Sequence, residues 1–310
     1  AILVPTTILA QQHYVTFRDR LKSFPIKIGL LNRFRSPKEQ KHILEQLKAG
    51  ELDLIVGTHR LLSDDVKFKD VGLLIVDEEQ RFGVVHKEKL KLLKNSVDTI
   101  TLSATPIPRT MHMAMMGAKD MSIINTPPHN RLPVKTEVSR FDRSLIREAI
   151  LKEIDRGGQV FFVHNRVQSI YGIHKLVQEI VPEVKVAVAH GQMKGHELEK
   201  VMLKFLDGEV QVLISTMIIE SGIDMPRANT LIVNRADRLG LGQLYQLRGR
   251  VGRSDQQAFA YLLIPPIKRL TQDAIKRLQT IQEYSQLGSG YKIAMRDLEI
   301  RGAGTILGAR

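Results

Sequence analysis

Leu73-Leu74-Ile75-Val76-Asp77-Glu78-Glu79-Gln80 decides the fold, because a short apolar run ends there in acidic residues. Strands that are covered on both faces, as in parallel sheets, typically consist of consecutive apolar residues and do not alternate between apolar and polar residues. Ligands of open α/β sheets bind at the carboxyl ends of such strands. We therefore expect Asp77 to hold Mg²⁺, through water, and Glu78 to orient an attacking water. A solvated acidic loop is the alternative interpretation of this motif.

Similar apolar runs alternate with helical stretches along the whole chain, which indicates βαβ units and an α/β fold with parallel sheets flanked by helices. The expected strands include residues 1–4, 53–56, 73–76, 99–102, 123–124, 160–163, 184–188, 210–214, 230–233 and 258–263. The expected helices include residues 37–49, 144–156, 167–180 and 194–206.

The chain divides most naturally at residues 126–133, a stretch with turn chemistry and no periodicity. We expect one lobe over residues 1–127 and a second over 128–264. In residues 265–310, apolar side chains recur at spacings of three and four from Ile267 to Ile281, and residues 291–300 form a second helical stretch. This pattern predicts a C-terminal helical hairpin followed by a loop.

A second motif, Gln246-Leu247-Arg248-Gly249-Arg250-Val251-Gly252-Arg253, supplies three arginines. On a helix, Arg250 and Arg253 would share a face, and Arg248 would lie on another. Guanidinium groups suit the phosphate charge that develops when a nucleoside triphosphate is cleaved. A basic surface helix is the alternative, but the two interleaved glycines would weaken such a helix without benefit. We expect the glycines to let an opposite lobe approach closely.

The composition favours a polyanionic partner. Over 310 residues, 46 Lys and Arg against 33 Asp and Glu give a net charge of +13. Aromatic residues make up 5% and Trp is absent, which favours backbone-phosphate contact over base stacking. Cys is absent, which excludes disulfides and cysteine metal sites. No apolar run reaches transmembrane length and no signal peptide opens the chain, so we expect a cytoplasmic protein with no membrane partner.

Polar residues follow several of the expected strands: Thr6, Thr7, Thr58, His59, Asn165, Arg166 and Thr216. Each alone is more often a helix cap than a ligand contact. Their recurrence on one sheet edge in a basic chain favours a track for nucleic-acid phosphates. Ser103 and Thr105 follow a further strand, where two hydroxyls could link nucleotide state to lobe movement.

The ordered set PTT, GTH, DEEQ, SATPIPRT, HNR, HGQM, STMIIESGID and QLRGRVGR resembles a superfamily 2 helicase-type motor with two RecA-like lobes. More closely, residues 77–87, 103–110, 126–128 and 243–252 resemble the translocase module of the bacterial transcription-repair coupling factor family, of which RecG is the nearest relative. Residues 297–304 resemble the translocation motif that the two families share.

The resemblance implies an ATP- and Mg²⁺-dependent motor that moves along double-stranded DNA. It also implies displacement of stalled RNA polymerase and promotion of nucleotide excision repair, through domains outside this chain. It assigns Asp77, Glu78, Arg250 and Arg253 to catalysis, Gln246, Gly222 and Asp224 to the nucleotide, and Ser103, Thr105 and Arg301 to coupling. The polar residues at the strand ends would face DNA phosphates.

The sequence departs from the family pattern in one respect. The glycine-lysine phosphate loop that normally lies just upstream of Ala1 is not in the sequence, so we expect this chain to bind ATP poorly and to hydrolyse it negligibly. Two alternatives stay open: a RecG-like helicase that remodels branched DNA, and a DNA-binding module without ATPase activity.

Overall fold

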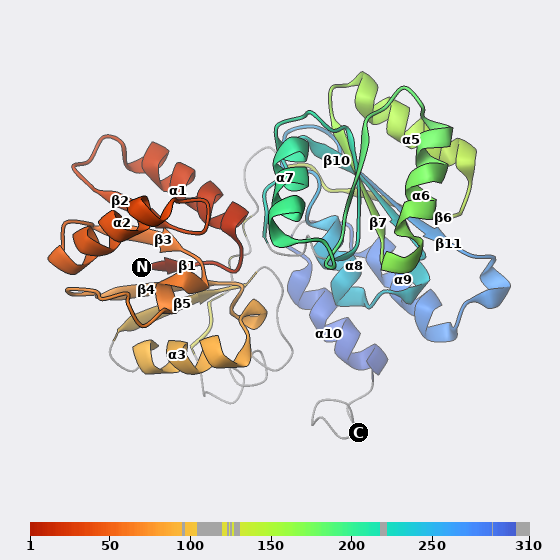
Figure 1. Cartoon of the computed structure of the whole chain (residues 1–310). Coiled ribbons are helices and arrows are strands. Elements are labelled where there is room, and N and C mark those ends of the chain that lie inside the picture. Colours follow the sequence, from red (N-terminus) through yellow and green to blue (C-terminus); the bar gives the residue numbers. More distant parts are fainter. Residues whose placement is uncertain are drawn as a thin grey trace. The chain divides into compact units, whose positions relative to one another are not determined.

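The computed structural model describes the chain except residues 95–96, 104–119, 123, 125, 127–130, 218–221, 287 and 302–310, and the side chains of 94, 291, 294, 298 and 301 (Figure 1). It divides into two compact units. Unit 1 is Ala1–Ala104 with Ser221–Asp224, and unit 2 is Thr105–Glu220 with Met225–Arg310. Among the described residues, no helix is long and apolar enough to cross a membrane.

Unit 1 is built on a five-stranded parallel sheet with the order β2-β3-β1-β4-β5. The strands are β1 (Ile2–Leu3), β2 (Ile28–Leu31), β3 (Leu54–Gly57), β4 (Leu73–Asp77) and β5 (Asp98–Leu102). The helices are α1 (Thr7–Leu21), α2 (Pro37–Ala49) and α3 (Val84–Lys94), with short 3₁₀ turns η1 (His59–Leu62) and η2 (Glu79–Arg81).

Helices cover both faces of this sheet. Leu9 of α1 packs with Ile2 in one buried cluster, whereas Leu47 of α2 and Leu90 of α3 pack with Leu3 in another. Successive strand residues point to opposite faces, so the neighbours Ile2 and Leu3 belong to different clusters. A sheet covered in this way explains why its strands are apolar runs without alternation.

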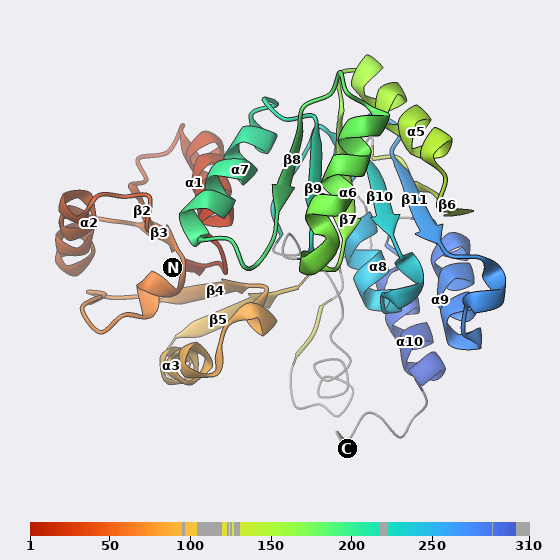
Figure 2. The same ribbon diagram turned by 45° about the vertical axis from the view of Figure 1, so that its right-hand side comes forward.

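Unit 2 holds a six-stranded parallel sheet with the order β6-β11-β10-β7-β9-β8 (Figure 2). The strands are β6 (Lys135–Arg140), β7 (Gln159–His164), β8 (Val186–Ala189), β9 (Val212–Ser215), β10 (Ala228–Asn234) and β11 (Phe259–Ile264). The helices are α5 (Arg143–Asp155), α6 (Val167–Ile180), α7 (Gly195–Leu206), α8 (Leu241–Arg248), α9 (Gln272–Glu283) and α10 (Gly290–Arg301), with 3₁₀ turns η4 (Ala236–Arg238) and η5 (Ile267–Arg269).

The predicted fold class is confirmed: both units are parallel α/β sheets flanked by helices. α2 and α6 begin and end at the predicted residues. The expected strand at residues 123–124 is wrong at Ile124, which is 90% exposed and outside any strand, while Ile123 lies outside the described residues. The strands β2 and β6 were not predicted. Both lie at sheet edges, and β6 carries polar residues because an edge strand is only partly covered.

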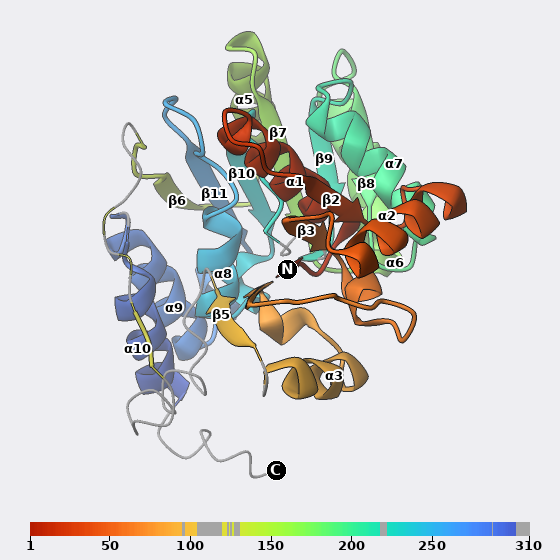
Figure 3. The same ribbon diagram turned by 90° about the vertical axis from the view of Figure 1, so that its left-hand side faces the viewer.

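The predicted C-terminal hairpin is confirmed, since α9 and α10 lie side by side and contact each other (Figure 3). α9 begins at Gln272 and not at Ile267, because Thr271 caps it by accepting a hydrogen bond from the Ala274 amide at 3.2 Å. The predicted lobe boundaries at residues 127 and 264 stay a prediction.

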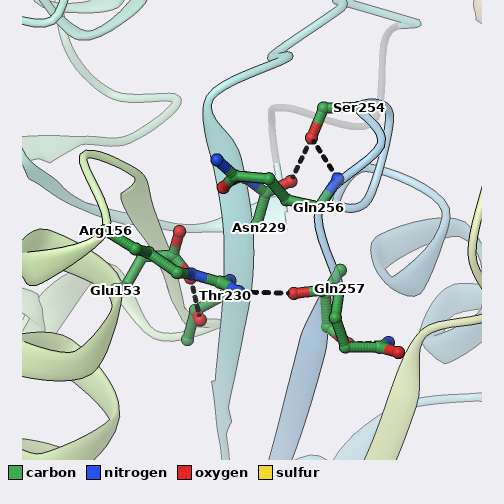
Figure 4. A network of polar contacts seen from close by, with 8 residues as sticks. Glu153, Arg156, Asn229, Thr230, Ser254, Gln256 and Gln257 are labelled. Atoms are coloured by element: carbon green, nitrogen blue, oxygen red, sulfur yellow. Dashed lines mark hydrogen bonds and ion pairs between the residues drawn. The ribbon is translucent and has the colours of Figure 1, made fainter.

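A buried polar network joins α5 to the amino-terminal ends of β10 and β11 (Figure 4). The Glu153 carboxylate, 1% exposed, accepts hydrogen bonds from Arg156 and from the Thr230 hydroxyl. Arg156 also donates to the Gln257 carbonyl at 2.7 Å. Glu153 is therefore a buried charge that depends on its partners.

Replacing Thr230 by Val is expected to lower the free energy of unfolding by about 1–3 kcal/mol, because the substitution keeps the shape and removes a donor to a buried carboxylate. Chemical denaturation of the purified chain measures this. Thr136→Val is the matched control: its hydroxyl donates to the Val134 carbonyl at 3.3 Å and is only half-buried. Equal losses in the two variants would contradict a special contribution of the Glu153 network.

Candidate functional site

The carboxyl ends of the unit 1 strands bring most of the predicted unit 1 residues to one edge. The strands run parallel, so the residues that follow them lie along the same side of the sheet. Thr6 and Thr7 follow β1, Thr58 and His59 follow β3, Asp77 ends β4 with Glu78 directly after it, and Ser103 follows β5. The sequence motifs are thus adjacent in space as well as ordered along the chain.

Asp77 is the last residue of β4 and is paired in register with Leu102 of β5. Its Oδ2 lies 3.3 Å from Nε2 of His13, which α1 carries back over the sheet. The His13 ring stacks on Phe17 with centroids 6.3 Å apart, so its orientation is restrained. The Oδ2 atom of Asp77 is therefore in contact with a His13 ring whose orientation is restrained. The sequence motifs did not predict this contact.

Glu78 occupies an unusual backbone conformation, with φ of 51° in the left-handed region. Such a conformation costs a residue with a side chain about 1–3 kcal/mol and recurs at functional sites. The residue is only 3% exposed, its amide donates to the Leu102 carbonyl at 3.0 Å, and Gln80 Nε2 donates to its carboxylate. Glu79 accepts from the Thr101 hydroxyl at 3.2 Å. The acidic motif is a fixed, partly buried turn and not a solvated loop.

The donor set at this edge fits a magnesium–nucleotide complex better than a metal held by protein alone. Within the described ranges, no three His, Cys, Asp or Glu side chains are grouped so that they could hold a metal ion. Mg²⁺ typically takes one or two carboxylates and completes its shell with water and substrate phosphates. The Asp77 carboxylate at the end of β4 is compatible with such a partial shell, and its role in holding Mg²⁺ stays a prediction.

The hydroxyl residues of unit 1 have local roles in the fold. Thr6 caps α1 by accepting from the Leu9 amide at 3.3 Å. Thr7 and Thr58 are both 5% exposed, and the Thr58 side chain makes no cap bond to η1. Thr6 is therefore a helix cap, the role that we expected for each of these polar residues when it is considered alone. Phosphate contact by Thr6, Thr7 and Thr58 stays a prediction.

The corresponding edge of unit 2 is organised around His164, the last residue of β7. Its Nε2 lies 2.7 Å from the Ser169 hydroxyl, and its Nδ1 lies 3.1 Å from Asn234 Nδ2. Burial, with a smaller contribution from the Arg166 charge, lowers the pKa of His164, which favours the neutral ring. Next to it, Asn165 and Arg166 are exposed.

Thr216 follows β9, the neighbour of β7 in the sheet. It is 6% exposed, and its amide donates to the Ala189 carbonyl at 3.2 Å. The exposed pair Asn165 and Arg166 is therefore better placed than Thr216 to meet a ligand from solvent.

The predicted helix through the arginine motif is wrong. α8 ends at Arg248 and is capped by Gly249, so Arg250 and Arg253 lie beyond it and share no helix face. Gly252 has a φ of 69°, and a Cβ there would lie 2.8 Å from the Ala258 Cβ. The glycine is thus required for the turn and for packing within unit 2, and the expectation that it lets an opposite lobe approach closely stays a prediction.

The three arginines differ in their surroundings. Arg248, 5% exposed, donates to the carbonyls of Ile281 and Tyr284, each at 2.6 Å, and so ties α8 to the end of α9. Burial lowers its pKa. Arg250 is 3% exposed, and Arg253 is half-buried with its Nε donating to the Gly249 carbonyl at 3.3 Å.

The remaining predicted residues belong to different elements of the two units. Gln246 lies in α8, and Gly222, with a φ of 79°, groups with unit 1. The Asp224 backbone exchanges two hydrogen bonds of 2.9 Å with the side chain of Gln12 in α1. Thr105 and the side chain of Arg301 lie outside the described residues.

Comparison with known proteins adds the family context. Residues 1–114 match the family model of the DEAD/DEAH box helicases, and residues 143–255 match the helicase conserved C-terminal domain. The chain is 59% identical over all 310 residues to the transcription-repair-coupling factor of Bacillus subtilis strain 168. It is 58% identical over 308 residues, 99% of its length, to that of Staphylococcus aureus strain USA300. It spans about a quarter of these relatives, 26% of the length of each.

A structure of RecG bound to a three-way DNA junction is also similar, with a TM-score of 0.81 and 38% identity. The match covers 98% of this chain and 40% of that one. The predicted resemblance to helicase-type motors, and within them to the coupling factors and RecG, is confirmed.

Proposed function

Because the chain belongs to the superfamily 2 helicase-type motors, we propose that it is the ATP-dependent, double-stranded-DNA translocase core of a transcription-repair coupling factor. In this role, the whole protein displaces stalled RNA polymerase and promotes nucleotide excision repair in the cytoplasm. The polymerase and the repair proteins would be engaged through domains outside this chain.

The observation that carries the ATPase part of the proposal is the turn at Asp77 and Glu78. Glu78 is a buried glutamate in a left-handed backbone conformation, and it directly follows Asp77 at the end of a strand. Such a conformation costs free energy, which favours a functional role for this turn. Asp77 would hold Mg²⁺, and the ion, when bound, neutralises phosphate charge. Glu78 would orient the attacking water and accept its proton. Arg250 and Arg253 would meet the phosphate charge, with Gln246, Gly222 and Asp224 near the nucleotide.

The DNA part of the proposal is supported by charge and by the strand-end residues. A net charge of +13 favours phosphate contact, and Asn165 and Arg166 are exposed at the carboxyl edge of the unit 2 sheet. Thr6, Thr7, Thr58, His59 and Thr216 complete the proposed set, and Ser103, Thr105 and Arg301 would couple hydrolysis to movement.

A RecG-like branched-DNA helicase is the second candidate. The structural similarity to RecG favours it, whereas the 59% identity to a coupling factor over the whole chain favours the first candidate. A DNA-binding module without ATPase activity would leave the strained turn at Glu78 without a role.

Phosphate release by the chain extended upstream through a phosphate loop distinguishes these functions. We expect linear duplex DNA to stimulate turnover strongly, with single strands giving little effect. Stronger stimulation by a three-way junction than by linear duplex would favour the RecG-like function. If no DNA supports ATP turnover, only the function of a DNA-binding module without ATPase activity would remain.

A further inference from the structure

His13 of α1 contacts the acidic turn, although it belongs to none of the sequence motifs. Its Nε2 lies 3.3 Å from Oδ2 of Asp77, which is 64 positions further along the chain. The His13 side chain is 28% exposed and the Asp77 side chain 18%, so the contact is partly shielded from water. Because Nε2 of an imidazole can carry a hydrogen, this geometry allows His13 to donate a hydrogen bond to the carboxylate. Between partly shielded groups such a bond is stronger than in bulk water.

The direction of α1 explains why the His13 ring reaches Asp77. α1 joins the parallel strands β1 and β2, so it runs from the carboxyl edge of the sheet back toward the amino edge. Leu9 and Ala10 are buried in the cluster against which Ile75 of β4 packs. His13 lies one turn after Leu9 on the same face of the helix. Helical side chains tilt toward the amino end of their helix, which here is the carboxyl edge of the sheet, so the ring points back toward Asp77.

The fold holds both partners of this contact in place. The start of α1 is capped by Thr6, and the His13 ring stacks on Phe17 with 25° between the ring planes. Asp77 is the last residue of β4 and is in register with Leu102 of β5. The backbone of Asp77 is therefore fixed by the sheet, and the contact with His13 restrains the rotation of its side chain.

The contact leaves one oxygen of Asp77 for another ligand. Among the residues that the structure describes, a polar side chain contacts Oδ2 and none contacts Oδ1. Mg²⁺ requires near-octahedral geometry with ligands at about 2.0–2.1 Å, so a carboxylate held in one orientation suits it better than one that rotates freely. Carboxylates that bind metals are typically hydrogen-bonded themselves, and the loss of such a partner costs about 10–100-fold in metal affinity or activity.

We propose that His13 is a positioning residue for Asp77, in which Nε2–H donates to Oδ2 and leaves Oδ1 in one orientation for a magnesium–nucleotide complex. This inference rests on the proposed function and deepens it, because it names the group that orients the proposed magnesium ligand. In this role His13 acts through Asp77 and does not itself contact the nucleotide.

Binding of a fluorescent ADP analogue to the chain extended upstream through a phosphate loop tests the proposal, in a Mg²⁺ titration and again in excess EDTA. His13→Phe keeps a ring that can stack on Phe17 and removes the donor nitrogen. We expect this variant to need about 10-fold more Mg²⁺ for half of the gain in nucleotide affinity, and to have an unchanged affinity in EDTA. His13→Gln restores an N–H donor of similar reach and should return the Mg²⁺ requirement toward that of the parent chain.

His42→Phe is the matched control, because it makes the same change at an exposed histidine of α2 and should leave the Mg²⁺ requirement unchanged. Thermal melting of each variant is compared with that of the parent chain. His13→Ala is a second variant without the donor, adds no bulk beside Phe17, and should need as much Mg²⁺ as His13→Phe. An unchanged Mg²⁺ requirement in both variants would overturn the role of His13. An equal increase in His13→Gln would also overturn it, because it would indicate packing of the ring and not donation by Nε2.

Failure of this proposal is distinguishable from failure of the proposed function. A parent chain whose nucleotide affinity depends on Mg²⁺, with the same dependence in the His13 variants, would overturn the positioning role alone. A higher Mg²⁺ requirement in His13→Phe and His13→Ala, with no duplex-stimulated phosphate release by the parent chain, would support the positioning role and overturn the motor. Nucleotide binding by the parent chain that is absent or does not respond to Mg²⁺ would overturn both.

Discussion

Glu78→Gln is expected to lower ATP turnover by about 10²–10⁴-fold, the usual contribution of a positioned general base, and to leave duplex binding unchanged. The amide keeps the size of the side chain but cannot accept a proton from water. The backbone conformation of the turn is equally accessible to both residues, so the variant should fold normally. Phosphate release by the chain extended upstream through a phosphate loop, with duplex DNA in excess, measures the loss.

Glu79→Gln is the matched control for this experiment, because it makes the same chemical change on the same turn. The Glu79 carboxylate accepts from the Thr101 hydroxyl at 3.2 Å, and an amide oxygen can also accept that bond. We expect less than about a tenfold loss of turnover, below the range for a general base. Turnover retained in Glu78→Gln would exclude the glutamate as the base, and equal losses in both variants would indicate a general effect of charge on the turn.

The position of the acidic pair could be predicted from sequence because it depends on local rules. An unalternating apolar run predicts a strand of a parallel sheet, and the residues after it must lie at the carboxyl edge. The same reasoning placed Thr6, Thr58 and Asn165 at strand ends, where the structure has them. Helices with a clear periodicity and a capping residue, such as α2 after Ser36, were predicted to the residue.

What the sequence could not show depends on backbone angles and on contacts between distant residues. The arginine motif has helical spacing, but α8 ends at Arg248 with Gly249 as its cap. Gly252 has a φ of 69°, and a Cβ there would lie 2.8 Å from the Ala258 Cβ. The contact between His13 and Asp77 joins residues 64 positions apart and requires the order of the strands to be known. The pair formed by His59 and His86 arises in the same way, from η1 and α3 meeting at one edge.

Arg253→Lys is expected to lower turnover by about 10³-fold or more, the range for loss of an arginine that stabilises transferred phosphate. Lysine keeps the charge but cannot spread it over a planar fork, so a large loss would indicate a geometric role. Arg253 is half-buried and its Nε donates to the Gly249 carbonyl at 3.3 Å, whereas Arg248 is 5% exposed, so replacing Arg253 should lower the melting temperature less than replacing Arg248. Phosphate release by the extended chain and a melting curve of the same sample give both values.

For Arg248→Lys in the same motif we expect the opposite result, a loss of stability with little loss of turnover. The Arg248 guanidinium bridges two carbonyls at the end of α9 and lies over the Tyr245 ring at 5.4 Å, and a lysine can satisfy only part of this set. A buried carbonyl left without its donor costs about 1–3 kcal/mol, and each kcal/mol lowers the melting temperature of a unit of this size by about 2–4 °C. We therefore expect a lower melting temperature and, at a temperature where the variant is folded, nearly normal turnover. The opposite pattern, with Arg248→Lys inactive but stable and Arg253→Lys active, would exchange the roles of the two arginines.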